Sequence, residues 1–217
     1  MRADQLLVER GLAASRSQAQ RLIAAGARWR APTGWRPLAK ADDLPADAEL
    51  ELLDAAEARY VSRGGLKLEG ALAAAGLDVR GWQCLDVGQS TGGFTDCLLQ
   101  HGAARVIGVD VGQGQLHPRL RADARVQCLE QCNARHLSIS DLIAAGAYPT
   151  SASGPFDPKI GAGFDLVTGD LSFISLTLVL PALAPLVKPG GALLMLVKPP
   201  FELPPAQIGT GGIVRDA

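Results

Sequence analysis

Two lysines and an aspartate stand where their side chains could take part in chemistry. Lys67 lies in "VSRGGLKLEGALAAAG" (residues 61–76), which reads as a helix that Ser62 can cap. Apolar residues recur there at roughly helical spacing, and we expect Lys67 close to their stripe, which comprises Leu66, Ala71, Leu72 and Ala75. Such a lysine either lays its methylenes on the edge of the core, with its ammonium in water, or serves a site as a cation. This helix alone leaves both interpretations open.

The other two groups follow apolar strands. Asp170 lies at the end of "GFDLVTGDL" (163–171), Ser172 directly follows that segment, and Lys198 comes at the end of "ALLMLVKPP" (192–200). The carboxyl ends of parallel strands meet at one edge of a sheet, so both side chains are expected to project into one crevice. Asp170 could instead cap the segment that follows it. We predict that Lys67, Asp170 and Lys198 converge beside a glycine-rich turn.

That turn is "LDVGQSTGGFT" (85–95), directly after the first strand of the region. A dinucleotide fingerprint needs G-x-G-x-x-G, but residue 90 is a serine, and a phosphate loop needs G-K-[ST], but the turn contains no lysine. The spacing D-x-G-x-x-x-G-G instead resembles the cofactor turn of S-adenosylmethionine-dependent methyltransferases. Asp110 ends the second strand, where an acid can accept hydrogen bonds from both ribose hydroxyls.

Asn133 follows the third strand, where it would contact the adenine amine of the cofactor. The sequence alone supports this contact and its absence equally. The candidate cofactor-binding residues are Asp86, Gly88, Ser90, Thr91, Gly92, Gly93, Phe94, Thr95, Asp110, Val111 and Asn133.

Strands and helices alternate through this region. Five apolar strands are expected at 82–88, 104–111, 124–131, 163–171 and 192–200, with helices at 92–102, 138–146 and 176–191. This alternation is typical of a doubly wound parallel sheet covered by helices on both faces. The Pro/Gly/Ser-rich segment 147–163 reads as an insertion in a loop.

The first part of the chain has a different character. Asp4 can cap a helix that stops at Gly11, and Ser15 and Gln18 have capping-box spacing before a second helix that ends at Gly26. A turn at 32–34 joins two short strands, and the acidic segment 41–53 adds one more. Arginines alternate with tryptophans around this turn, a pattern that suits phosphate contacts and stacking, although the tryptophans could equally be the core of so small a domain.

Charge separates the same two parts. Residues 1–40 contain eight basic and two acidic residues, a net charge of +6, whereas the remainder carries −7. A basic head on an acidic body indicates a polyanion-binding module. The candidate RNA-binding residues are Arg16, Arg21, Arg28, Arg30 and Arg63. No apolar run approaches the ~20 residues of a membrane helix, and four cysteines without a C-x-x-C pair argue against a zinc site. We expect a cytoplasmic protein that binds no metal.

Motifs in both parts resemble known families. "RADQLLVERGLAASRSQAQRLIAAGARW" is similar to the S4 domain, a small RNA-binding fold, over residues 3–52. "SRGGLKLEGAL", "LDVGQSTGGFT", "DVGQGQL", "NAR", "DLSFISL" and "LVKPPFE" resemble the FtsJ-like ribose 2′-O-methyltransferases and, with the S4 head, the TlyA family, whose members are known as haemolysins and as rRNA methyltransferases. The resemblance spans residues 1–217. It implies a Rossmann-like α/β methyltransferase domain at 62–217, a linker at 55–61 and an α+β S4-like domain at 1–54.

The family implies transfer of a methyl group from S-adenosylmethionine to the 2′-hydroxyl of cytidines in ribosomal RNA or ribosomal subunits. Lys67, Asp170 and Lys198 match the first three members of its K-D-K-E tetrad. We assign Lys198 as the base, Lys67 as the group that holds the 2′-oxygen, and Asp170 as the group that orients Lys198.

The fourth member of the tetrad lies on a later strand in the family, whereas this chain stops at "GGIVRDA". We therefore expect the C-terminal part of the domain to be missing, "ALLMLV" to form an exposed edge, and turnover to be low. Glu202 belongs to the "KPPFE" loop and is not assigned to the tetrad. Two alternatives are a non-catalytic RNA-binding protein with this fold and a membrane-lytic haemolysin, for which no amphipathic basic helix is visible.

Overall fold

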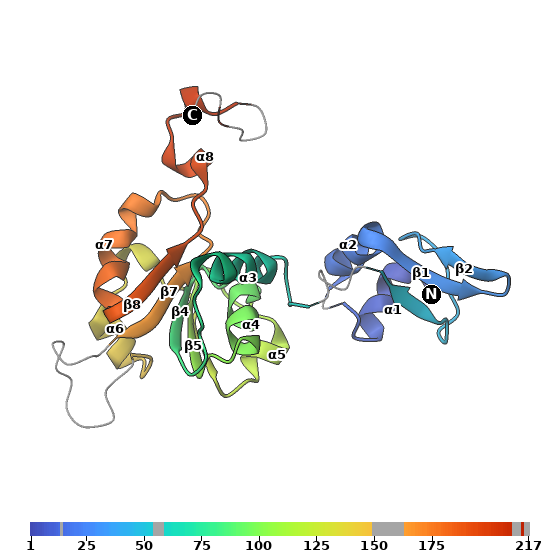
Figure 1. Ribbon diagram of the computed structural model, residues 1–217, viewed down its shortest axis with the longest axis horizontal. Coiled ribbons are helices and arrows are strands. Elements are labelled where there is room, and N and C mark those ends of the chain that lie inside the picture. Colours follow the sequence, from blue (N-terminus) through green and yellow to red (C-terminus); the bar gives the residue numbers. More distant parts are fainter. Residues whose placement is uncertain (14, 54–58, 149–162, 210–213, 215–217) are drawn as a thin grey trace. The chain divides into compact units, whose positions relative to one another are not determined.

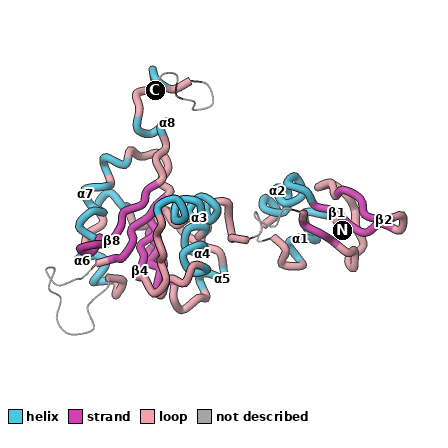
Figure 2. Tube along the Cα trace, in the orientation of Figure 1, coloured by secondary structure: helices cyan, strands magenta, loops and turns pink. Residues whose placement is uncertain are grey.

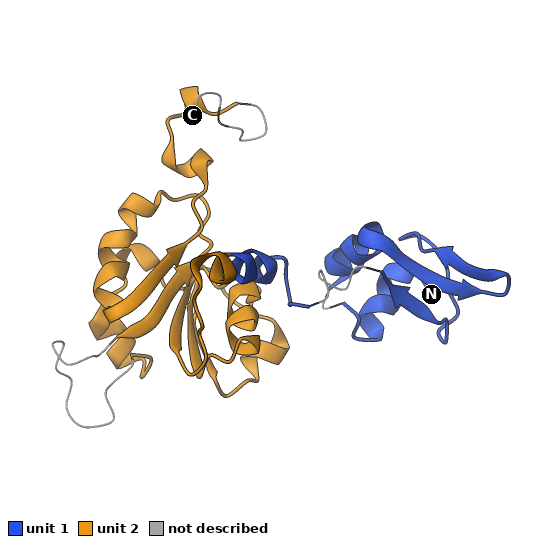
Figure 3. Cartoon of the chain, viewed as in Figure 1, with its two compact units in different colours: residues 1–70 blue, residues 71–217 orange. Residues whose placement is uncertain are grey.

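The computed structural model describes residues 1–13, 15–53, 59–148, 163–209 and 214. It divides into two compact units, residues 1–70 and 71–217, which Figure 3 shows in two colours. The division falls within helix α3 (Gly64–Ala75). The sequence places the boundary earlier, in the 55–61 segment. Because residues 54–58 lie outside the described residues, that linker stays a prediction.

The first unit contains two helices and a small antiparallel sheet. Helices α1 (Ala3–Glu9) and α2 (Arg16–Gly26) precede strands β1 (Ala27–Ala31), β2 (Gly34–Pro37) and β3 (Leu50–Leu52), arranged in the order β2-β1-β3. The Ser15 hydroxyl accepts a hydrogen bond from the Gln18 amide at 3.2 Å, which confirms the predicted cap of α2. Leucines and alanines of both helices form one core, and the half-buried Trp29 packs against it.

The predicted helix-capping role of Asp4 is wrong. Arg2 occupies the N-cap of α1, and no side chain caps that helix end. Asp4 is the second residue of the helix and is fully buried, where it accepts hydrogen bonds from Arg2, Arg16 and Gln20. A buried carboxylate needs charged or polar partners, and those supplied by α2 provide them. Asp4 therefore ties α1 to α2.

The second unit is built on a five-stranded parallel sheet, as predicted (Figure 1). Its strands are β4 (Gln83–Val87), β5 (Arg105–Val109), β6 (Val126–Leu129), β7 (Phe164–Gly169) and β8 (Val187–Met195). Their order is β6-β5-β4-β7-β8, so the chain extends the sheet in one direction from β4 and then returns to add β7 on the other side. The strand order reverses at the β4–β7 pair, which is where ligands bind in open α/β sheets.

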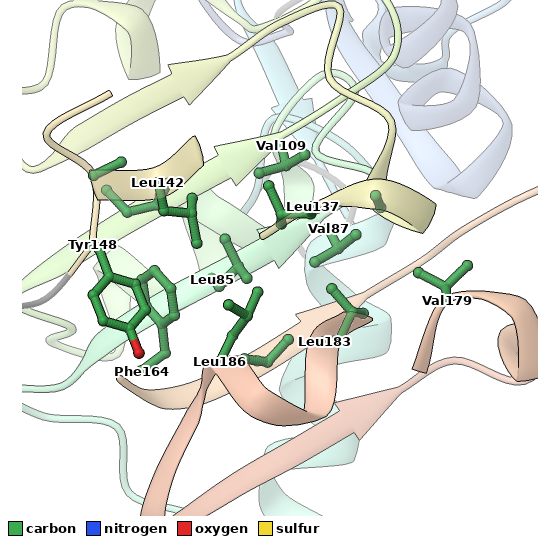
Figure 4. Close-up of a cluster of buried hydrophobic side chains, with 14 residues drawn as sticks. Leu85, Val87, Val109, Leu137, Leu142, Tyr148, Phe164, Val179, Leu183 and Leu186 are labelled. Atoms are coloured by element: carbon green, nitrogen blue, oxygen red, sulfur yellow. The ribbon is translucent and has the colours of Figure 1, made fainter. Parts of the chain in front are cut away.

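Helical segments cover both faces of this sheet (Figure 2). On one face, Leu85 and Val87 pack with side chains of α6 (Ile139–Ala144), α7 (Leu180–Leu183) and the neighbouring 3₁₀ turns in a single apolar cluster (Figure 4). Side chains alternate along a strand, so Asp86 lies on the opposite face. There α4 (Gly93–Gln100) packs against β4 and β5. A short helix, α5 (Pro118–Arg121), follows β5, and another, α8 (Pro199–Glu202), follows β8.

The predicted helix at 176–191 differs from the structure. It is a 3₁₀ turn (Leu176–Leu178), the four-residue α7 and a second 3₁₀ turn (Ala184–Leu186), and β8 already begins at Val187. Pro181 and Pro185 remove two backbone donors from this stretch, which prevents a regular helix. Gly191 lies against β7, where an added Cβ would come within 2.9 Å of the Phe164 carbonyl oxygen, so 187–191 joins the sheet through an irregular register.

The apolar face of α3 also differs from the prediction. The buried positions are Gly65, Leu68 and Leu72, whereas Ala75 is exposed and Lys67 lies on the exposed side. The spacing of small alanines misled the prediction, because alanine is compatible with either face of a helix. Most of the predicted insertion at 147–163 lies outside the described residues.

Candidate active site

The glycine turn, residues 88–93, lies at the carboxyl end of β4 and leads into α4. Gly88 has φ +81° and Gly92 has φ +96°, a backbone region that residues with a Cβ rarely adopt. A Cβ at Gly88 would lie 3.0 Å from the Leu171 side chain and 3.5 Å from the Asp170 carbonyl oxygen. The turn therefore closely approaches the segment that follows β7, across the point where the strand order reverses.

Asp86 holds the start of α4. It is 1% exposed, and its carboxylate accepts hydrogen bonds from the Thr95 backbone amide at 3.0 Å and the Thr95 hydroxyl at 2.7 Å. Burial raises the pKa of Asp86 to about 7, with the Thr95 hydrogen bonds acting in the opposite direction and the charges of Asp110 and Asp170 adding to the rise. Asp86 thus acts on the turn from beneath, through Thr95.

Asp110 closes the turn from the neighbouring strand. Its two carboxylate oxygens accept hydrogen bonds from the backbone amides of Ser90 and Gly112, each at 2.7 Å. Ser90 has φ +49°, and its hydroxyl donates to the Gln115 side chain at 3.2 Å. A carboxylate has about four lone-pair positions, so Asp110 retains acceptor capacity for ligand hydroxyls beside these two bonds.

The remaining predicted residues occupy three different environments. Thr91, Gly93 and Phe94 are part of the turn and of the first turn of α4, with Phe94 buried. Val111, next to Asp110, is 69% exposed. The Asn133 side-chain oxygen accepts from the Arg135 amide at 3.0 Å and caps a 3₁₀ turn (Ala134–His136), so the adenine contact stays a prediction.

The predicted pair at the next two strand ends is assembled in the structure. Lys198 Nζ lies 2.5 Å from an Asp170 carboxylate oxygen and donates to the Ser172 hydroxyl at 2.7 Å. Both partners of the ion pair are largely buried, with side-chain exposures of 25% and 19%. Strands β7 and β8 pair in parallel, and the Leu196 backbone amide, just after β8, donates a hydrogen bond to the Gly169 carbonyl oxygen at the end of β7. This pairing brings Asp170 and Lys198 side by side.

Lys67 belongs to the first compact unit and lies on the exposed side of α3. Its convergence with Asp170 and Lys198 stays a prediction. Glu202, which the sequence left unassigned, accepts from the Ser175 hydroxyl at 2.6 Å and the Leu176 amide at 2.8 Å. These hydrogen bonds lower the pKa of Glu202 and make it a cap for the 3₁₀ turn that begins at Leu176.

Two features near the strand ends escaped the sequence analysis. Phe173 is 90% exposed with φ +64°, and its ring lies 5.3 Å from that of Phe201. An exposed aromatic residue in this backbone region is unusual and favours a binding role, such as stacking on a base. Gln89, in the middle of the glycine turn, is by contrast buried, since only 3% of it is exposed. The signal available in the sequence was a long polar side chain within a tight turn.

The predicted RNA-binding arginines have different surroundings in the structure. Arg16 pairs with the buried Asp4 at 3.0 Å, and Arg28 pairs with Glu51 at 2.6 Å. The guanidinium groups of Arg28 and Arg30 lie 5.0 and 5.6 Å from the ring centroid of Trp35. Arg63 is exposed and Arg21 is half-buried. The β1–β2 hairpin therefore presents an aromatic ring between cations on its surface.

No helix among the described residues is long and apolar enough to cross a membrane. Within the same residues, no three histidine, cysteine, aspartate or glutamate side chains are grouped so that they could hold a metal ion.

Comparisons with known proteins extend this description. The model of the FtsJ-like methyltransferase family matches residues 60–217, and that of the S4 domain matches residues 1–27. The chain is 44% identical to the 16S/23S rRNA (cytidine-2′-O)-methyltransferase TlyA of Mycobacterium tuberculosis, over 99% of this chain and 73% of that protein. It is 36% identical to Hemolysin A of Brachyspira hyodysenteriae, over 100% of this chain and 81% of that protein. A solved structure of a candidate hemolysin from Streptococcus thermophilus matches with a TM-score of 0.64 and 42% identity, covering 100% of this chain and 72% of that one.

Proposed function

This chain belongs to the TlyA family of FtsJ-like methyltransferases with an S4 domain, and from that premise we propose that it methylates ribose 2′-hydroxyls of ribosomal RNA. The methyl donor is S-adenosylmethionine. The observation that carries the proposal is the Lys198–Asp170–Ser172 cluster at two strand ends, beside the glycine turn. Cytidine as the modified nucleotide is taken from the relative's activity.

The residues around the turn fit this cofactor. The glycines with positive φ allow the backbone to approach a ligand closely, and the Asp110 carboxylate keeps acceptor positions for ribose hydroxyls. The exposed Val111 beside it supplies an apolar surface for a flat ring. When bound, S-adenosylmethionine supplies the electrophilic methyl carbon.

Lys198 is the residue that we assign to the 2′-oxygen. The ribose hydroxyl is a very weak acid, so its reaction needs a base or a cation that stabilises the developing alkoxide. As an amine, Lys198 accepts the hydroxyl proton. The ammonium so formed pairs with the Asp170 carboxylate, donates one proton to the Ser172 hydroxyl and keeps another available for the oxygen. Asp170 thus stabilises the product of proton transfer and fixes the direction of the side chain.

Lys67 and the basic head complete the proposal. Lys67 is assigned to hold the 2′-oxygen on the basis of the family pattern. The first unit is proposed to grip RNA through its exposed arginines and Trp35, and Phe173 to stack on a base near the site. The acceptor is a ribosomal RNA or a ribosomal subunit, and a cytoplasmic location accompanies such a substrate.

Methyl transfer tests the proposal directly. Deproteinised rRNA and assembled subunits are incubated with methyl-labelled S-adenosylmethionine, and the labelled nucleotide is mapped after nuclease digestion. We expect label on a ribose 2′-oxygen. Label on a base, or no label with either substrate at protein concentrations that bind the cofactor, would contradict the proposal.

A further inference from the structure

Gln89 is buried in the glycine turn in an unusual way. Its side-chain nitrogen donates to the Thr95 hydroxyl at 2.8 Å, and that hydroxyl in turn lies 2.7 Å from the Asp86 carboxylate. With Asp86 ionised, the single Thr95 proton goes to the carboxylate, so Thr95 can only accept from Gln89. The three side chains form a directional chain of hydrogen bonds that runs from the turn, through α4, to β4.

The space that Gln89 occupies exists because residue 108 is glycine. Gly108 pairs with Asp86 in the β4–β5 ladder and therefore faces the same side of the sheet. A Cβ built on Gly108 would lie 1.9 Å from the Gln89 side-chain carbonyl carbon. A side chain at residue 108 would thus displace Gln89 from between β5 and α4.

A second observation concerns the side-chain oxygen of Gln89. It is buried and accepts no hydrogen bond from the residues that the structure describes. A buried acceptor without a partner costs free energy, and such costs are tolerated where a group has a function. Here the residue with the unpartnered acceptor lies in the turn that we assign to cofactor binding.

We propose that Gln89 is a positioning residue: its amide, acting through Thr95 and Asp86, fixes the glycine turn in the conformation that binds S-adenosylmethionine. The inference rests on the proposed function, because it deepens the role of the same turn. Gln89 does not touch the reacting atoms. Its effect is on cofactor affinity and KM, with kcat changed less.

Calorimetric titration of the full chain with S-adenosylmethionine separates the two proposals. If the unmodified protein does not bind the cofactor, the proposed function fails. If it binds and Gln89→Met binds equally well, the inference alone fails. Gln89→Met keeps the length of the side chain but removes its donor, and we expect affinity about three- to tenfold lower. Gln100→Met is the matched control, since Gln100 lies on α4, outside the turn, and its side chain donates to Asp96 at 3.1 Å.

The Gln89→Glu variant tests whether Gln89 acts through its hydrogen bond, because a purely steric role would give no pH-dependent change in cofactor affinity. When ionised, the introduced carboxyl group cannot donate to Thr95 and adds a second negative charge beside Asp86, whereas its protonated form donates as glutamine does. Affinity relative to the unmodified protein should therefore be reduced at pH 8 and recover toward pH 5.5. The other charged groups around this chain are Asp110 after β5, Asp170 with Lys198 after β7 and β8, and Asp96 with Arg119 at α4. These groups are common to both proteins, so the carboxyl group introduced at residue 89 is the only titratable group that differs between them.

A double substitution tests the packing. Gly108→Ala alone should weaken cofactor binding more than Gly108→Ala combined with Gln89→Ala, because the smaller residue 89 relieves the overlap. Circular dichroism and thermal unfolding identify any variant that fails to fold. A pH-independent affinity ratio for Gln89→Glu, or additive effects of the two alanines, would overturn the positioning role.

Discussion

At the scale of single residues, the site contains charged side chains that interact closely with their neighbours. Lys198 and Asp170 form a compact pair at the carboxyl ends of β7 and β8, and Ser172 adds a third partner. Asp86 is a buried acid whose pKa is raised to about 7. Titratable groups with perturbed pKa values or close charge partners are often found near catalytic sites.

Lys198→Ala should lower the rate of methyl transfer by ~10²–10⁴-fold, the usual range for a proton-transfer group, and change cofactor affinity little. Lys198→Arg should rescue poorly, because a planar guanidinium does not replace a compact ammonium. Lys188→Ala is a matched control: Lys188 pairs with Asp165 on the same two strands, at the opposite end of the sheet. Single-turnover kinetics measure the rate. Normal turnover by Lys198→Ala would remove this residue from the reaction.

Asp86 makes stability depend on pH. Its pKa is about 7 in the folded chain and about 4 in an unfolded one, so the folded state holds the extra proton between these values. The contribution of Asp86 to stability therefore falls as pH rises from about 4 to 7 and is constant above. The melting temperature of Asp86→Asn minus that of the unmodified protein should increase from pH 5 to pH 7.5. Asp123→Asn is the control, since the pKa of Asp123 is about 2 and its difference should be flat.

At the scale of elements, a buried charge connects the two helices of the first unit. Asp4 holds α1 to α2 through Gln20, Arg16 and Arg2, which together keep the pKa of its carboxyl well below the usual range. The contribution of Asp4 to stability is present above the ordinary aspartate pKa and is lost as the pH falls through the lowered value.

Asp4→Asn should lower the unfolding midpoint of the first unit, because a neutral amide leaves two arginines without a buried counter-charge. Asp43→Asn is the control: Asp43 is 84% exposed and pairs with the N-terminal amine, so its loss should cost only the ~0–1 kcal/mol of an exposed pair. Thermal unfolding at pH 7 followed by circular dichroism compares them. Equal midpoints for the two variants would show that Asp4 does not connect the helices.

At the scale of the whole molecule, basic and acidic charge lie in different parts of the chain. Residues 1–40 carry +6 and the remainder −7, so attraction to RNA is expected from residues 1–40, the N-terminal part of the first unit. Its arginines are not equivalent, since Arg16 and Arg28 are engaged in ion pairs whereas Arg30 and Arg36 are exposed.

Arg30→Ala and Arg36→Ala in the full chain should each weaken rRNA binding and reduce the slope of log affinity against log salt by about 1 or somewhat less. Arg16→Ala should do so too, but with a loss of stability through Asp4. Arg80→Ala is the control, because Arg80 pairs with Asp78 on the surface of the second unit. Filter binding across a range of salt concentrations gives the slopes. Unchanged slopes for Arg30→Ala and Arg36→Ala would show that the basic surface is incidental.

The sequence by itself determined the features that depend on local pattern. Apolar runs identified the parallel strands, Ser15 and Gln18 marked the start of α2, and the glycine spacing after Asp86 located the turn, because each depends on residues close together in the chain. Only the tertiary structure decided what depends on partners distant in sequence. Asp4 became a buried link because α2 folds against it. Lys198 met Asp170 and Ser172 through strand pairing, and Gln89 was buried because β5 offers a glycine opposite it. Such contacts arise from packing between elements, which no local pattern records.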